Sequence, residues 1–273
     1  MYMKTKQKIT IIMILVSIII ITIFLPSIKS FYNQVMNREF IENVGSNALS
    51  ANIKIVQLKY SNGENGSSIA VSAGASGVIT RKEGDRYFAL TAKHVISELD
   101  DVDKTQTVVM GYDELDFKDT LNMGGEYKGI ENYYMQFPEI TVEYTNTKYD
   151  LALISFMSDK VYTALSLAED IPKYGDKVAS MSNPYGKRNI ITAGKIGSKK
   201  FWTYEDEAGK IKYPIIKHSA ITSRGSSGSA LLNEDLEIVG INLGGNENLF
   251  HQFTSGMAMP NDRIHDFLEE SEN

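Results

Sequence analysis

The chain has 273 residues, and its 28 Lys and Arg against 34 Asp and Glu give a formal net charge of −6. It contains no cysteine, which excludes disulfides, thiolate metal sites and a cysteine nucleophile. The hydrophobic fraction of 42% and the charged fraction of 23% are typical of a globular protein. The acidic balance argues against nucleic acid as a partner, because phosphate contacts need clustered Lys and Arg.

The first thirty residues predict a membrane anchor. Residues 1–8 carry Lys4, Lys6 and Lys8 without an acid, and residues 9–28 carry no charge. A helix of that length spans about 30 Å, the hydrocarbon thickness of a bilayer. We expect a cytoplasmic basic tail over 1–8 and an uncleaved, single-pass signal anchor over 9–28, with the remainder outside the cytoplasm. A cleaved signal peptide followed by secretion is the alternative, although the apolar run is longer than usual for one.

Residues 29–51 are polar and mixed, and we interpret them as a stalk or juxtamembrane helix. From residue 52 the pattern changes to short β-type runs separated by turns. The predicted strands cover residues 53–60, 68–73, 77–80, 87–91, 105–112, 139–144, 151–156, 177–182, 189–196, 211–217, 230–232, 237–243 and 256–259. Many short strands at this spacing predict an all-β sandwich or barrel. Residues 263–270 predict a capped terminal helix, and 269–273 form a tail.

Three residues of the kind used in nucleophilic catalysis occur in separate segments. His94 ends a predicted strand, Asp150 directly precedes another, and Ser227 lies in a Gly/Ser turn before a third. Each alone is more often structural: a core or surface histidine, a turn or cap aspartate, a loop serine. A serine hydroxyl becomes a good nucleophile when an adjacent base takes its proton, and imidazole titrates near neutral pH. The joint occurrence of the three favours catalysis.

Their order and surroundings resemble the chymotrypsin-fold (trypsin-like) serine proteases, and most of all the bacterial glutamyl-endopeptidase (V8-like) and HtrA-like branches. The family pattern T-A-x-H-V matches residues 91–95, and D-L-A-L-I matches 150–154. The G-N-S-G-G pattern matches 225–229, with Ser226 in place of the Asn and Ser229 in place of the last Gly.

The resemblance covers residues 52–268 and implies a trypsin-like protease domain. It implies two antiparallel six-stranded β-barrels, at about 52–160 and 174–260, with a C-terminal helix. The active site would then lie between the barrels. The short stretch after Met259 leaves us expecting no PDZ domain of the HtrA kind.

The resemblance also implies a role for each site residue. Ser227 would attack the peptide carbonyl, His94 would take its proton, and Asp150 would hold and stabilise the imidazolium. The backbone N–H groups of Gly225 and Ser227 would form the oxyanion hole. No cofactor and no metal are implied. The remaining histidines lack metal-ligand spacing, and we interpret each as a satisfied core or surface residue: His218, His251 and His265.

Substrate preference is partly bounded by the same resemblance. Ile221 stands where trypsin-type enzymes carry an acid, which disfavours Lys or Arg at P1, the substrate residue before the scissile bond. Thr222 matches the V8-like pattern for Glu, but Asn242 replaces its histidine, so we expect an apolar or small P1 residue. The edge that pairs with the substrate backbone would be formed by Leu243, Gly244 and Gly245.

The segment between His94 and Asp150 is longer than expected for the bacterial branches. We place the excess in residues 111–137, as an insertion or as a surface loop that shapes the cleft. Its acidic residues are alternatives to Asp150 as the acid, but no apolar strand follows them. We therefore interpret them as solvated loop residues: Asp113, Asp116 and Asp119.

Taken together, the sequence predicts a serine endopeptidase, anchored in the cell membrane of a bacterium, that acts on extracytoplasmic proteins or peptides. The alternative is a catalytically weak or inactive homologue that acts as a peptide-binding module at the membrane surface. A third hypothesis is an enzyme that cleaves its own stalk within residues 29–50.

Overall fold

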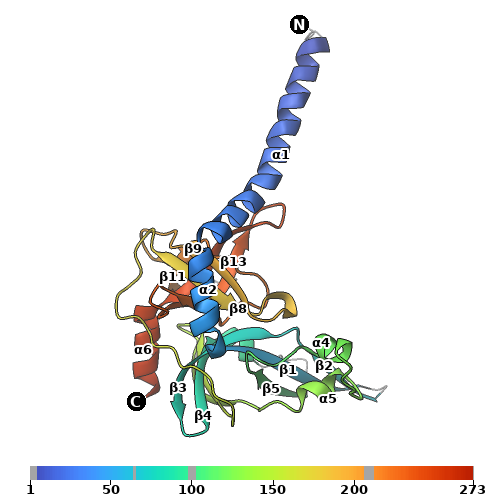
Figure 1. Ribbon diagram of the computed structural model, residues 1–273, viewed down its shortest axis with the longest axis vertical. Helices are drawn as coiled ribbons and strands as arrows, with labels where there is room; N and C mark the ends of the chain where they lie inside the picture. The colour runs from blue at the N-terminus through green and yellow to red at the C-terminus, as the bar shows by residue number, and fades with distance from the viewer. Residues whose placement is uncertain (1–4, 64–65, 98–102, 206–211, 273) are drawn as a thin grey trace.

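The structure is a computed structural model that describes residues 5–63, 66–97, 103–205 and 212–272. Two antiparallel sheets form the body, and the long helix α1 (Thr5–Met36) projects away from it (Figure 1). The first sheet has seven strands in the order β2-β1-β3-β4-β7-β6, with β5 paired to β1. These strands are β1 (Asn52–Gly63), β2 (Gly66–Val71), β3 (Ala75–Glu83), β4 (Arg86–Ala92), β5 (Lys104–Met110), β6 (Thr141–Asn146) and β7 (Leu151–Met157).

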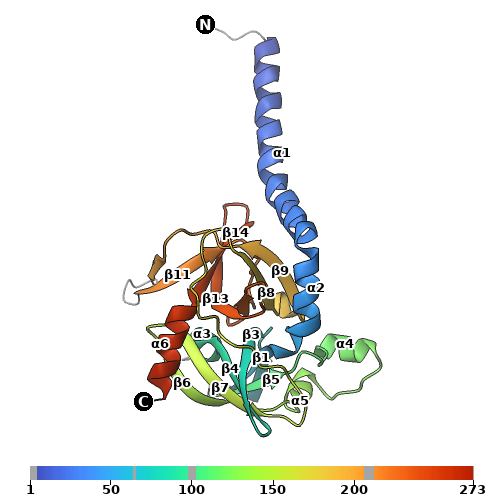
Figure 2. The same ribbon diagram turned by 60° about the vertical axis from the view of Figure 1, so that its left-hand side comes forward.

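The second sheet also has seven strands, in the order β10-β11-β14-β13-β12-β8-β9. These strands are β8 (Lys177–Ser182), β9 (Ile190–Lys195), β10 (Trp202–Glu205), β11 (Lys212–His218), β12 (Ala230–Leu232), β13 (Ile238–Glu247) and β14 (Phe253–Pro260). Figure 2 shows this sheet between α1 and the first sheet.

The prediction of two closed six-stranded barrels is wrong, because each sheet is open and has seven strands. Where the edges of the first sheet approach each other, the backbone pairing between β5 and the chain before β6 is a single isolated bridge between Val108 and Glu139. The second sheet has a similar isolated bridge between Ile196 and His218. The extra strand arises where one strand is divided between partners. The start of β1 pairs with β3 and its end pairs with β2, while β11 is divided in the same way between β10 and β14.

The core of the first sheet brings two strand ends together. Strands β4 and β7 are almost wholly buried and run antiparallel, with Ala92 opposite Leu151. Burying a side chain such as Leu90 or Ile154 contributes about 1.5–3 kcal/mol, and both are fully buried. The chain that leaves β4 therefore lies beside the chain that enters β7, next to His94 and Asp150.

The predicted terminal helix is confirmed as α6 (Asn261–Ser271), which buries Ile264 and Phe267. The segment predicted as a stalk is helical: α1 ends at Met36 and α2 (Arg38–Asn47) follows, before a 3₁₀ turn, η1 (Leu49–Ala51). The α2 helix packs on β8 and β9 through Phe40 and Val44, which belong to the main hydrophobic core. The C-terminal half of the segment predicted as a stalk is thus part of the folded body.

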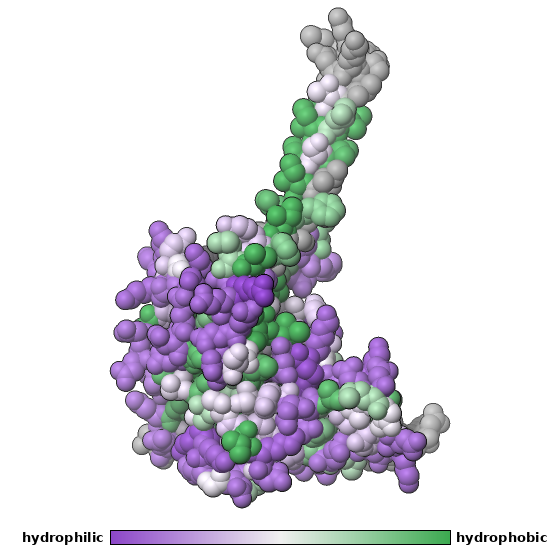
Figure 3. Space-filling view, viewed as in Figure 1, coloured by the Kyte–Doolittle hydropathy of each residue, from purple (hydrophilic) through white to green (hydrophobic). Residues whose placement is uncertain are grey.

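Apolar side chains are exposed along α1, as the space-filling view shows (Figure 3). Among the residues that the structure describes, no helix has the length and hydropathy needed to cross a membrane. The span predicted over residues 9–28 falls in α1, and some of its side chains lie outside the described residues. It therefore remains a prediction.

Candidate active site

His94 and Asp150 form a hydrogen-bonded pair at the end of the first sheet. His94 lies in the short helix α3 (Lys93–Ile96), directly after β4. Its Nδ1 lies 2.7 Å from Oδ2 of Asp150, and its backbone N–H donates to Oδ1 over 3.0 Å. The N–H of Lys93 donates to the carbonyl of Asp150 over 2.9 Å. A carboxylate beside Nδ1 favours the tautomer that carries its proton there, which leaves Nε2 as the basic nitrogen.

Asp150, which holds His94, has an unusual backbone conformation. Its φ of 51° lies in the left-handed region, which costs a residue with a side chain about 1–2 kcal/mol. Such strain persists only where the surroundings hold it, and it concentrates at functional sites. The carboxylate is 17% exposed and the His94 ring is 46% exposed, so the histidine faces solvent while its partner is shielded.

Ser227 lies in a tight turn that two glycines make possible. Gly225 has a φ of 96° and Gly228 a φ of 83°, values that side chains rarely tolerate. A Cβ at Gly225 would lie 2.7 Å from the carbonyl oxygen of Asn183. A Cβ at Gly228 would lie 2.1 Å from Oγ1 of Thr91. The turn therefore packs closely against both sheets, against Asn183 after β8 and Thr91 in β4.

The carbonyls of this turn are bound by β3, through Ser76. The Ser76 hydroxyl donates to the carbonyl of Gly225 over 2.8 Å, and its N–H donates to the carbonyl of Ser227 over 3.0 Å. Within the described residues, the N–H groups of Gly225 and Ser227 donate to no protein acceptor. Two backbone donors on a fixed turn can bind an oxyanion.

The hydroxyl of Ser227 donates to the carbonyl of Leu243 in β13 over 3.2 Å. In the described part of the chain it makes no hydrogen bond to His94. Contacts between nucleophile and base are often loose before substrate binds. A hydrogen bond from the Ser227 hydroxyl to the imidazole would require that hydroxyl to leave the Leu243 carbonyl.

The predicted substrate-binding residues divide into two groups. Thr222 donates through Oγ1 to the carbonyl of Gly244 over 3.3 Å, and a Cβ at Gly245 would lie 2.8 Å from the Oγ1 of Thr222. The Ile221 carbonyl accepts from Thr192 over 2.9 Å. Asn242, by contrast, is fully buried, and its amide donates to Ser229 and Ser180 inside the second sheet. Substrate contacts by all of these residues stay predictions.

His218 departs from the interpretation of a satisfied histidine. It lies at the end of β11, opposite Gly256, and is 1% exposed. Its ring faces the side chain of Asn242 and the backbone of Ala220, but among the described residues neither ring nitrogen makes a hydrogen bond of normal geometry. Burial lowers its pKa to about 4, because a charged imidazole loses its hydration there. It is thus a neutral core residue.

The sequence gives little signal for the polar network that joins the two sheets behind the turn. The amide of Asn183 donates to the carbonyl of Ile53 over 2.9 Å, and its backbone N–H donates to the Ser76 hydroxyl over 2.9 Å. The amide of Asn52 donates to Asn189 over 2.9 Å. Of these residues, only Asn183, before Pro184, has a sequence signal, and that signal predicts a turn but not hydrogen bonds between the two sheets.

Residues 75–241 match the family model described as "Trypsin-like peptidase domain", which is more than half of the chain. The chain belongs to the trypsin-like peptidase family. The matched segment contains His94, Asp150 and Ser227, so the predicted family is confirmed.

The curated proteins similar to this trypsin-like chain include HtrA-type serine proteases. It is 31% identical to "Serine protease HTRA4" of Mus musculus over 135 residues, which are 48% of this chain and 26% of that protein. It is 30% identical to "Periplasmic serine endoprotease DegP" of Salmonella typhimurium over 127 residues, 42% of this chain and 24% of that protein. The chain thus spans about a quarter of the length of these relatives.

Proposed function

We propose that this chain is a serine endopeptidase that hydrolyses peptide bonds of extracytoplasmic proteins. The observation that carries the proposal is the turn around Ser227, where the N–H groups of Gly225 and Ser227 have no protein acceptor among the described residues and lie on the same fixed loop as the Ser227 hydroxyl. The paired His94 and Asp150 are the second support. Membership of the trypsin-like family and the likeness to HtrA proteases agree with it.

In the proposed reaction, Ser227 leaves the Leu243 carbonyl and donates to Nε2 of His94. Its oxygen attacks the substrate carbonyl while His94 takes the proton. The N–H groups of Gly225 and Ser227 bind the developing oxyanion, where the loss of one donor typically costs about 100- to 1000-fold in rate. His94 then gives the proton to the leaving amine. Water, deprotonated by His94, attacks the acyl-enzyme, and the proton returns to Ser227 as the acid product leaves.

Substrate binding would use the part of β13 beyond its pairing with β12, which ends at Ile241; we call residues 243–245 the β13 edge. The Leu243 carbonyl, vacated by Ser227, would accept the N–H of the P1 residue, as backbone pairing requires. Ile221 supports an apolar or small P1 side chain, because it brings no carboxylate to pair with Lys or Arg.

The proposal includes a single-pass membrane anchor with the protease domain outside the cytoplasm. Its support is the uncharged stretch 9–28 after a basic tail and the exposed apolar side chains of α1, which include Ile12, Ile18 and Leu25. Release from the membrane after cleavage of this segment is the alternative localisation.

A peptide-binding module without cleavage is the second candidate. The hydrogen bond from Ser227 to Leu243, in place of one to His94, favours it. In that case the β13 edge would still hold peptides, and Ser227→Ala would leave peptide binding unchanged.

Cleavage of a peptide library by the full chain in detergent tests the proposal. We expect products from the wild type, none from Ser227→Ala or His94→Ala, and products from the matched control Ser223→Ala, which removes a hydroxyl from the same turn. Folded wild-type protein that binds peptides without cleaving any would overturn the proposal and favour the binding module.

A further inference from the structure

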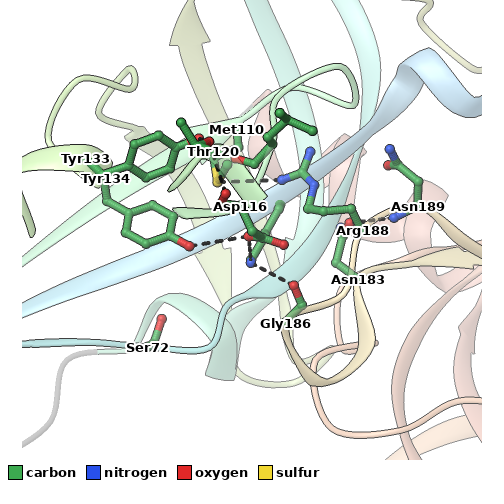
Figure 4. Close-up of polar contacts among 12 residues, drawn as sticks. Ser72, Met110, Asp116, Thr120, Tyr133, Tyr134, Asn183, Gly186, Arg188 and Asn189 are labelled. Atoms are coloured by element: carbon green, nitrogen blue, oxygen red, sulfur yellow. Dashed lines mark hydrogen bonds and ion pairs between the residues drawn. The ribbon is translucent and has the colours of Figure 1, made fainter. Parts of the chain in front are cut away.

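A lysine side chain is buried where the 111–137 insertion, the first sheet and the second sheet meet. Lys54 lies on β1, and its side chain is 2% exposed. Figure 4 shows Asp116, Tyr134 and Gly186 close together in this region. Burial lowers the pKa of Lys54. An ammonium group in such a place needs a close counter-charge, because desolvation is costly.

Asp116 supplies that counter-charge from the insertion. Its carboxylate, 15% exposed, accepts a hydrogen bond from the Lys54 ammonium. It also accepts from the hydroxyl of Tyr134 over 3.3 Å. Tyr134 belongs to the short helix α5 (Ile130–Tyr134) and is buried in the core formed with β1 and β5. The interpretation of Asp116 as a solvated loop residue is therefore wrong, since a partner distant in sequence buries it.

The Lys54 ammonium has a second acceptor, the carbonyl of Gly186, at 3.1 Å. Gly186 ends the 3₁₀ turn η2 (Pro184–Gly186), which touches the nucleophile turn. The N–H of Tyr185 donates to the carbonyl of Arg224 over 2.7 Å. A Cβ at Gly225 would lie 3.2 Å from that same nitrogen. A chain of contacts therefore runs from Asp116 through Lys54 and η2 to the turn that holds Ser227.

A second group of hydrogen bonds joins the insertion to the segment that follows η2. The guanidinium of Arg188 donates to the carbonyl of Gly111, and its Nη1 lies 3.6 Å from Sδ of Met110. The amide of Asn189 donates to the carbonyl of Tyr112 over 2.6 Å. The start of the insertion is therefore bound on the same side as η2.

We propose that Asp116 is a positioning residue for the oxyanion turn, acting through Lys54 and η2. This inference rests on the proposed function for its effect on rate. Loss of the Asp116 charge leaves a buried ammonium with one neutral acceptor. Lys54 then withdraws or reorients, Gly186 loses its donor, and η2 no longer fixes the Arg224 carbonyl. The N–H groups of Gly225 and Ser227 are thereby displaced from the oxyanion position.

The test compares Asp116→Asn with Asp113→Asn in the full chain. Asp113 lies in the same insertion and pairs with Lys160 over 2.9 Å on the protein surface, so the control makes the same chemical change away from η2. Two readouts are needed: kcat and KM per titrated active site, and hydrogen–deuterium exchange of the segment 223–228. We expect Asp116→Asn to lower kcat about 10- to 100-fold, as small misplacement of reacting groups does, with KM unchanged. We also expect faster exchange in 223–228, and Asp113→Asn to match the wild type in both readouts.

Wild-type kcat and wild-type exchange in folded Asp116→Asn would overturn the inference. If the wild type cleaves nothing, the proposed function fails, and the exchange of 223–228 alone decides the inference. If Asp116→Asn does not fold, the double variant Lys54→Met/Asp116→Leu is tested in its place, because it removes both buried charges together. Faster exchange in the double variant supports the inference, and unchanged exchange overturns it.

Discussion

Replacing Gly228 with alanine should both destabilise the protein and disable the nucleophile turn. A side chain at its φ of 83° costs about 1–2 kcal/mol. The new Cβ would also lie 2.1 Å from Oγ1 of Thr91 and 2.2 Å from the carbonyl oxygen of Ser76. Relief requires moving the backbone of β3, and overpacking of this kind costs about 1–3 kcal/mol more. The Thr91 hydroxyl donates to that carbonyl over 2.8 Å, and loss of this hydrogen bond would cost about 1 kcal/mol more.

We therefore expect Gly228→Ala to lower the free energy of unfolding by about 3–6 kcal/mol, summed from these contributions. Gly84→Ala is the matched control: Gly84 has a φ of 58°, and nothing lies within 4 Å of its added Cβ. It should cost only the conformational part, about 1–2 kcal/mol. Urea unfolding measures both variants, and fluorophosphonate labelling reports on the turn. Equal losses of stability in the two variants, with labelling intact in Gly228→Ala, would refute the steric reasoning.

The pKa of His218 falls from 6.5 in the unfolded chain to about 4 in the folded protein, so between these pH values the unfolded chain binds the extra proton. The free energy of unfolding should therefore decrease as pH falls from 6.5 to 4, by about 3 kcal/mol in total. His218→Gln should remove this part of the acid sensitivity in urea unfolding at several pH values, and an unchanged pH profile would contradict the prediction. Phe40→Ala should cost about 3 kcal/mol by leaving a cavity under α2, whereas Phe31→Ala, at a side chain 72% exposed, should change thermal stability little; equal effects would mean that α2 does not belong to the body. Asp150→Asn should reduce kcat by about 10⁴-fold, as in the trypsin-like family, and a loss of less than tenfold in the cleavage assay would argue that another group orients His94.

The sequence was sufficient for the elements whose signal is local. Short apolar runs between turns identified β4 and β7, and the spacing of Ile264 and Phe267 identified the inner face of α6. The residues of the predicted triad were found by motif, and the pairing of Ala92 with Leu151 explains why His94 and Asp150 meet. The strand β10 was missed, because four residues give too short an alternation.

Features that depend on long-range pairing could not be predicted in this way. Barrel closure depends on whether two distant edges form a ladder, and among the described residues the backbone pairing between them is limited to isolated bridges. Asp116 looks solvated among polar neighbours, and only the fold reveals that Lys54 lies buried beside it. The orientation of the Ser227 hydroxyl toward Leu243 is likewise a side-chain property that no motif encodes.

The most direct test of the account is fluorophosphonate labelling of the full chain, with the modified residue identified by peptide mass spectrometry. We expect a single adduct on Ser227, formed at a rate that falls sharply in His94→Ala and is unaffected in Ser223→Ala. An unlabelled folded wild type, or an adduct on another serine that persists in Ser227→Ala, would contradict the claim that this turn carries the nucleophile.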